Sequence, residues 1–178
     1  KRQFQNHGNV GDSAIWLGEA AQLERSGCAI RHVCNELDYD ARSLRRAVGD
    51  GPILLSGGGN FGDVWPAHQR FRERVLADFP DLTVILANLG VWGTDRYFRP
   101  LLEQYPRVHV EISQYILDGG IEAVVRDYGA GRLLFGSDFP RAYHGAAMLM
   151  LAHAEIPDQD KQAIASGNLD RLLAEVKI

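Results

Sequence analysis

Short apolar runs alternate with helix-like stretches along this chain of 178 residues, and this alternation constrains the fold more than any other feature. The runs are rich in Val, Ile and Leu, as is typical of strands buried on both faces of a sheet. They lie at residues 29–33, 53–55, 82–87, 108–112 and 133–135. Strands that alternate with helices are expected to be parallel and joined by right-handed crossovers. The pattern therefore predicts an α/β protein.

Helix-like stretches occupy the intervals between these runs. We expect one helix that is capped by Asp12 or Ser13 and stopped by Gly27. Further helices are expected at 41–48, 66–79, 95–105, 119–128, 144–154 and 158–176, the last with a break at Gly167. Because helices separate all the strands, they should cover both faces of the sheet, and the last two should form a helical pair at the C-terminus.

The number of strands favours an open sheet. About five strands are too few for an eight-stranded closed barrel, and they suit a Rossmann-like or flavodoxin-like sheet. Since no linker or low-complexity segment divides the chain, residues 1–178 are expected to form a single α/β domain. An open sheet leaves unpaired edges, and a homo-oligomer would be one way to cover them.

Charge and composition exclude several classes of partner. The net charge of −4 and the pI of about 5.8 give no basic face for nucleic acid. No apolar run reaches the length of a membrane span, so no membrane partner is expected. Cys28 and Cys34 are too few and too poorly spaced for a disulfide framework or a zinc clip. A cytoplasmic protein with reduced thiols is the expectation.

A glycine-rich segment, Gly57 to Asp63, follows the apolar run at 53–55. Glycines after a parallel strand let the backbone approach a ligand closely, and the next helix presents free N–H groups to an anion such as phosphate. No Lys follows as in a P-loop, and the spacing differs from that of a dinucleotide fingerprint. The segment is either a ligand cradle or simply a tight turn.

A second motif, G-S-D-F-P, follows the apolar run at 133–135 and carries Asp138. An Asp at the C-terminal end of a parallel strand faces the usual ligand side of a sheet, where it can bind a metal or act as a base for metal-bound water. Alternatively, it caps the next turn. His144, six residues later, is the local partner that we predict for Asp138, and Glu111 is a further candidate.

The first half of the chain carries N-V-G-D-S-A-I-W-L-G-E and G-G-G-N-F-G-D-V-W-P-A-H-Q. With these motifs, residues of about 1–79 resemble the N-terminal part of polysaccharide pyruvyl transferases, which move a pyruvyl group from phosphoenolpyruvate to a sugar. The resemblance implies a phosphorylated small molecule as ligand. The residues that it places in the cleft are Asn9, Gly11, Asp12, Gly58, Gly59, Asn60 and Asp63.

The second half carries V-I-L-A-N-L-G-V-W-G, R-V-H-V-E-I-S, L-L-F-G-S-D-F-P and S-G-N-L-D-R-L-L. With these motifs, residues of about 80–178 resemble the C-terminal part of the amidohydrolases, metal-dependent hydrolases with a TIM-barrel fold. The resemblance implies that Asp138 binds or faces a metal, zinc or another divalent ion. Asn88 stands where the family often has a metal-binding His, and the early H-x-H pair is absent. The implied metal site is therefore incomplete, and no cofactor is expected.

The two resemblances meet near Phe79-Pro80-Asp81, and they predict a chimera of two α/β fragments, engineered or recombined. Because each half lacks catalytic partners, we expect no complete active site. Two alternatives stay open. The chain is either a metal-dependent hydrolase remnant that uses Asp138 and His144, or a module that binds phosphate or a phospho-sugar through the glycine-rich segment.

Overall fold

The computed structural model describes residues 10–49, 51, 53–55, 65–89 and 95–175, with only the backbone of 10–13. The described chain forms two compact units, and the division falls between Val75 and Leu76. The expectation of a single domain and of a seam near residues 79–81 stays a prediction.

The regular secondary structure described in the first unit is helical. It contains α1 (Val10–Arg25), α2 (Ala41–Val48) and most of α3 (Pro66–Asp78). The predicted stop of α1 at Gly27 is confirmed, because this glycine adopts a positive φ of 72° after the last turn. Asp40 caps α2 by accepting a hydrogen bond from the Ser43 amide at 2.7 Å. Tyr39 is buried and packs edge-on against Phe71 with 5.3 Å between the ring centroids.

Two of the predicted strands are wrong. Residues 29–33 and 53–55 have no regular secondary structure. A strand exists only where its backbone pairs with a neighbour, and an apolar run alone does not supply that neighbour. Ile30 and Leu54 are accordingly exposed, so these runs are not buried on both faces as the composition suggested.

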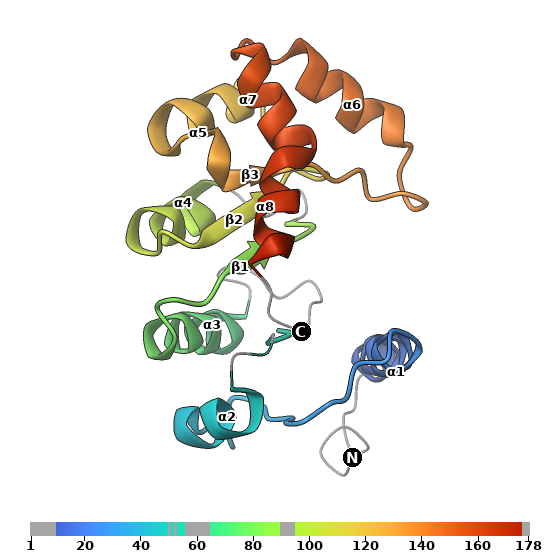
Figure 1. The fold of residues 1–178 in the computed structure, drawn as a ribbon, viewed down its shortest axis with the longest axis vertical. Helices are drawn as coiled ribbons and strands as arrows, with labels where there is room; N and C mark the ends of the chain where they lie inside the picture. Colours follow the sequence, from blue (N-terminus) through green and yellow to red (C-terminus); the bar gives the residue numbers. More distant parts are fainter. Residues whose placement is uncertain (1–9, 50, 52, 56–64, 90–94, 176–178) are drawn as a thin grey trace. The chain divides into compact units, whose positions relative to one another are not determined.

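The second unit contains a parallel sheet. Its strands β1 (Val84–Leu86), β2 (Val108–Glu111) and β3 (Leu133–Leu134) lie in the order β1-β2-β3 (Figure 1). The register pairs Val84 with Val108 and Val110 with Leu133. An α/β fold with an open parallel sheet is thus confirmed, while the described residues supply three strands rather than about five.

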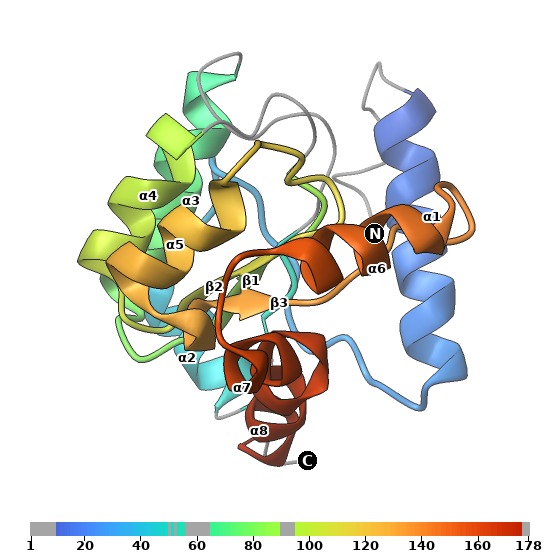
Figure 2. The same cartoon turned by 90° about the horizontal axis from the view of Figure 1, so that it is seen from above.

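Helices cover both faces of this sheet, as predicted. Figure 2 shows α4 (Asp95–Gln104) and α5 (Gly120–Tyr128) on one side of the strands and α8 (Asn168–Ala174) on the other. The chain also forms α6 (His144–His153) and α7 (Asp158–Gln162). Between α7 and α8 lies a π-helical turn, Ala163–Gly167, at the point where the sequence predicted a break.

The core of the second unit lies between the sheet and its helices. The apolar side chains buried there include Phe98, Leu102, Val108, Val110, Ile112, Val124, Leu133 and Ile164. Two polar side chains join the layers. Arg132 donates hydrogen bonds to the carbonyl oxygens of Val108 and Tyr105, each at 2.7 Å, and buried Asn168 donates to those of Ala130 and Leu133, each at 2.8 Å. Among the described residues, no helix is long and apolar enough to cross a membrane.

Candidate functional site

The C-terminal ends of the three strands bring three polar side chains together. Asn88 follows β1, Glu111 is the last residue of β2, and Asp138 lies shortly after β3. Because the strands are parallel, these ends share one edge of the sheet, which is where ligands usually bind in α/β proteins. The expectation that Asp138 lies at this edge is therefore met by the strand directions.

Asp138 is held by three donors. One carboxylate oxygen accepts a hydrogen bond from Nδ2 of Asn88 at 3.1 Å, and the other accepts one from Nε2 of Gln114 at 2.7 Å. Nε of Arg141 lies 3.2 Å from the second oxygen. The Asp138 side chain is only 13% exposed. A carboxylate that is fixed in this way has a defined orientation, which proton transfer requires.

The backbone of this pair is unusual. Asn88 and Asp138 both adopt the left-handed conformation, with φ of 52° and 54°. Asn and Asp tolerate this region better than other residues with a side chain, but it is sparsely populated and is often found at functional sites. Both left-handed residues lie just beyond a strand end, and their side chains meet each other.

Glu111 anchors the middle of the site. Its carboxylate accepts hydrogen bonds from the Asn88 amide at 3.1 Å, the Ser113 amide at 2.6 Å and the Ser113 hydroxyl at 2.8 Å. Gly136 passes so close that a Cβ at this position would lie 1.9 Å from Oε1 of Glu111. With its oxygens engaged, Glu111 positions Asn88 and the loop after β2.

His144 lies apart from this network. It is the first residue of α6 and is exposed, and its ring lies 4.8 Å from that of Tyr143 and 5.9 Å from that of Phe139. Among the described residues, the side-chain partners of Asp138 are Asn88, Gln114 and Arg141. The Asp138–His144 contact that the sequence suggested is therefore not formed, while a catalytic role for either residue stays a prediction.

Sequence reasoning missed Gln114 and Arg141. Arg141 directly follows G-S-D-F-P, so its closeness to Asp138 in the chain was an available signal. Gln114 lies 24 residues from Asp138 and reaches it only because β2 and β3 are neighbours. No local pattern in the sequence indicates that contact.

The glycine-rich site falls outside the described residues. Asn9, Gly58, Gly59, Asn60 and Asp63 are not described. Gly11 and Asp12 lie within α1, of which only the backbone is described at these positions. The cleft implied by the pyruvyl transferase resemblance thus stays a prediction.

The donor set around Asp138 does not fit the implied metal. The described residues contain no group of three or more His, Cys, Asp or Glu side chains that could hold a metal ion. Asn88 and Gln114 turn their amide nitrogens toward Asp138, and these nitrogens are not metal ligands. The Arg141 guanidinium at 3.2 Å would also repel a divalent cation. The expectations of an incomplete zinc site and of no cofactor stay predictions.

His109 is buried away from this network. One ring nitrogen lies 3.0 Å from the carbonyl oxygen of Gly131. Burial lowers the pKa of His109 below its ordinary value, because the charged imidazolium loses its hydration. The side chain therefore serves packing between β2 and the turn before β3.

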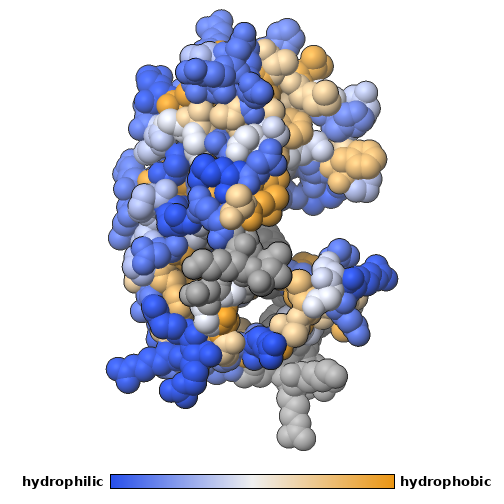
Figure 3. Space-filling model, in the orientation of Figure 1, coloured by the Kyte–Doolittle hydropathy of each residue, from blue (hydrophilic) through white to orange (hydrophobic). Residues whose placement is uncertain are grey.

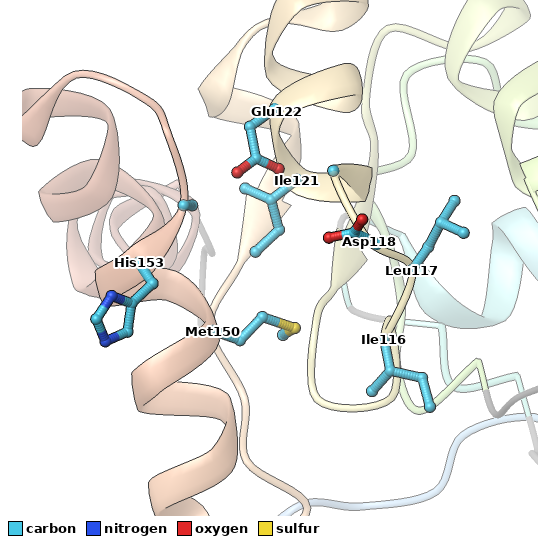
Figure 4. A pocket seen from close by; sticks show the side chains of 9 residues that line it. Ile116, Leu117, Asp118, Ile121, Glu122, Met150 and His153 are labelled. Atoms are coloured by element: carbon cyan, nitrogen blue, oxygen red, sulfur yellow. The ribbon is translucent and has the colours of Figure 1, made fainter.

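A separate pocket of about 360 Å³ lies between the loop after β2, the start of α5 and α6 (Figure 4). Met150 and Ile121 approach each other across it, while the His153 ring points outward. The residues that line it are Ile116, Leu117, Asp118, Gly119, Ile121, Glu122, Met150, His153 and Ala154. None of the site residues predicted from the sequence is among them.

Part of the chain is similar to pyruvyl transferases. It is 37% identical over 114 residues, 61% of this chain, to Pyruvyl transferase 1 of Schizosaccharomyces pombe. It is 32% identical over 86 residues, 48% of this chain, to a putative pyruvyl transferase EpsO of Bacillus subtilis. The matched parts make up 28% and 26% of these relatives, so the chain spans about a quarter of their length.

A solved structure shows the fold relationship. The chain superposes with a TM-score of 0.61 on an uncharacterized TIM-barrel protein, Bb4693 of Bordetella bronchiseptica, at 21% identity. The superposition covers 90% of this chain and 62% of that protein. The likeness is to a barrel protein, whereas the sequence favoured a Rossmann-like or flavodoxin-like arrangement. The sheet in the described residues is itself open.

The sequence model of the Amidohydrolase family matches residues 57–174, which is more than half of the chain. The match includes all three strands and every residue of the Asp138 network. Both resemblances inferred from the sequence are therefore confirmed. Since the family match begins at Gly57 and the first pyruvyl transferase match spans 61% of the chain, the two similarities share part of the sequence. The chain belongs to the amidohydrolase family.

Proposed function

We propose that the second unit supplies the proton-accepting side of a hydrolase site, with Asp138 as the general base. The observation that carries the proposal is the orientation of one partly buried carboxylate by Asn88 and Gln114 at the C-terminal edge of a parallel sheet. Membership of the amidohydrolase family supports hydrolysis as the class of reaction.

The proposed chemistry is the addition of water to the carbonyl carbon of an ester, lactone or amide. The water oxygen forms a bond to the carbon while Asp138 accepts a proton from the water, and the π electrons of the C=O bond move onto the carbonyl oxygen. The C=O bond then re-forms as the bond between the carbonyl carbon and the leaving oxygen or nitrogen breaks, and the leaving group takes the proton from Asp138. Asn88 and Gln114 hold the carboxylate in place during both transfers. No step passes through a metal, because the donors around Asp138 do not fit one.

We further propose that the chain is a composite, recombined or engineered, whose hydrolase site is not complete within one copy. Similarity to two families supports this composite origin. A composite that keeps the base but lacks part of its surroundings would hydrolyse only reactive substrates. Association of copies at the edges of the sheet is a proposal of the same kind, and the molar mass in solution tests it.

The test is hydrolysis of activated substrates, such as 4-nitrophenyl acetate and dihydrocoumarin, by the whole chain. Asp138→Asn should lower kcat/KM at least tenfold, since it removes the base and keeps the shape. Asp127→Asn is the control, because Asp127 pairs with Arg99 and Arg126 away from the site. Equal rates for the Asp138→Asn variant and the original chain would contradict the role of Asp138. The absence of any hydrolysis would contradict the hydrolase and leave the composite.

A second candidate function is the binding of a phosphorylated small molecule by residues 57–63. The identity of 37% to a pyruvyl transferase over 61% of the chain favours it. Titration with phosphoenolpyruvate should shift the amide resonances of Gly58 and Gly59, and Gly59→Val should abolish the shifts because a side chain would block close approach. Unchanged resonances at millimolar phosphoenolpyruvate would exclude useful binding.

A further inference from the structure

The segment between β3 and α6 carries Arg141, whose guanidinium is largely exposed to solvent. Arg141 uses Nε to contact Asp138, and its two terminal amino groups have no partner among the described residues. We propose that these amino groups bind the carboxylate of an anionic substrate with a flat apolar body. The proposal names the substrate class of the site proposed above and rests on that function.

The contact with Asp138 orients the Arg141 guanidinium. The Arg141 side chain is 73% exposed, while the Asp138 side chain that holds its Nε is 13% exposed. The Ala142 amide donates a hydrogen bond to the Asp138 carbonyl oxygen at 2.8 Å, which fixes the turn that carries Arg141. A guanidinium presents five N–H groups in a planar fork. With Nε engaged, the opposite edge still offers two parallel donors that match the two oxygens of a carboxylate.

Exposed aromatic rings flank this cation. Phe139 and Tyr143, two residues before and two residues after Arg141, are 69% and 75% exposed. Figure 3 shows apolar surface on the protruding loop between β3 and α6. Large exposed aromatic side chains that gather on one segment commonly mark a binding surface. They offer a flat face for the apolar body of a ligand whose carboxylate reaches Arg141.

The local charge favours a monoanion. Asp138 and Arg141 together carry no net charge, so a ligand gains from the directed hydrogen bonds of Arg141 rather than from a field of positive charge. A dianion such as phosphate would meet the Asp138 carboxylate at short range and would be repelled more strongly. A substrate with one carboxylate next to its scissile bond could place that bond near Asp138.

The experiment is an NMR titration of the whole chain with benzoate, and with benzamide as a neutral molecule of the same shape. Benzoate should bind saturably and shift the amide resonances of residues 138–144, and benzamide should bind at least tenfold more weakly. Arg141→Gln should lower the affinity for benzoate at least tenfold. Arg126→Gln is the matched control, because the Arg126 side chain is 71% exposed and also pairs with an aspartate.

Equal affinities for benzoate and benzamide, or for the Arg141→Gln variant and the original chain, would overturn the proposal, as would the absence of saturable binding. The benzoate–benzamide comparison uses the unaltered chain, so the proposal stays testable if the variant fails to fold. Benzoate binding through Arg141 without hydrolysis would refute the hydrolase alone. Hydrolysis that needs Asp138, with a KM for carboxylate-bearing esters that Arg141→Gln leaves unchanged, would refute the anion site alone.

Discussion

Replacing Gly136 by alanine tests how tightly the strand ends are joined. A Cβ at this position would lie 1.9 Å from Oε1, 2.4 Å from Cδ and 2.8 Å from Cγ of Glu111. All three distances are shorter than van der Waals contact, so the Glu111 side chain must move. Its carboxylate accepts three hydrogen bonds, from the Asn88 amide and from the amide and hydroxyl of Ser113, and a displaced carboxylate loses them.

The expected loss in the free energy of unfolding follows from these hydrogen bonds. Three hydrogen bonds at about 1 kcal/mol each sum to roughly 3 kcal/mol. An alanine restricts the unfolded chain more than a glycine does, and this lower entropy of the unfolded state stabilises the folded protein by about 0.5–1 kcal/mol. Gly136→Ala should therefore lower the free energy of unfolding by about 2 kcal/mol. With a urea dependence of about 2 kcal/mol per M, the unfolding midpoint should fall by about 1 M.

Urea unfolding followed by circular dichroism measures this change, and two further variants decide its cause. Gly131→Ala is the control, because a Cβ there would meet nothing within 4 Å. In a Glu111→Ala background the Glu111 atoms that the new Cβ would strike are absent, so Gly136→Ala should be neutral or should stabilise the protein by about 0.5 kcal/mol. The same loss of stability in both backgrounds would refute the reasoning, since the cost would then not pass through Glu111.

Two more predictions concern polar side chains at the core of the second unit, partly buried Arg132 and buried His109. Arg132→Met should destabilise the protein by about 2–3 kcal/mol, because it removes the charged donor to the carbonyl oxygens of Val108 and Tyr105 and leaves the Tyr105 oxygen with the Val108 amide alone. Thermal unfolding against Arg126→Met checks this, and equal midpoints would contradict it. Because the pKa of His109 is lowered, the unfolded chain takes up a proton that the folded chain resists. Stability from this group should be complete above the ordinary pKa of 6.5 and fall as the pH drops below it, and His109→Gln should flatten urea midpoints measured between pH 7 and pH 5.

Local patterns predicted those parts of the fold that depend on neighbours in the chain. The apolar runs at 82–87, 108–112 and 133–135 each contain a strand, because each found a parallel partner. The runs at 29–33 and 53–55 have similar composition but no ladder in the described residues. The composition of a segment indicates whether it can fit into a sheet, whereas its pairing depends on segments that are distant in sequence.

The candidate site divides in the same way. The position of Asp138 at the strand edge follows from one strand and its direction, so sequence reasoning reached it. Its partners Asn88 and Gln114 lie 50 and 24 residues away and depend on the register of the sheet. His144 was predicted as a partner from its spacing, but the start of α6 places its ring beside Tyr143 and Phe139 instead.

The hydrogen bond between Asn88 and Asp138 joins the ends of two strands that are not neighbours, since β2 lies between β1 and β3. Glu111, at the end of that middle strand, accepts a hydrogen bond from the backbone amide of Asn88. A slip of β2 by one residue would turn Glu111 to the opposite face and release Asn88. The polar residues that we assign to chemistry thus also stabilise the register of β1, β2 and β3. A substitution chosen to alter catalysis here will therefore also weaken the preference of these strands for the native register over a shifted one.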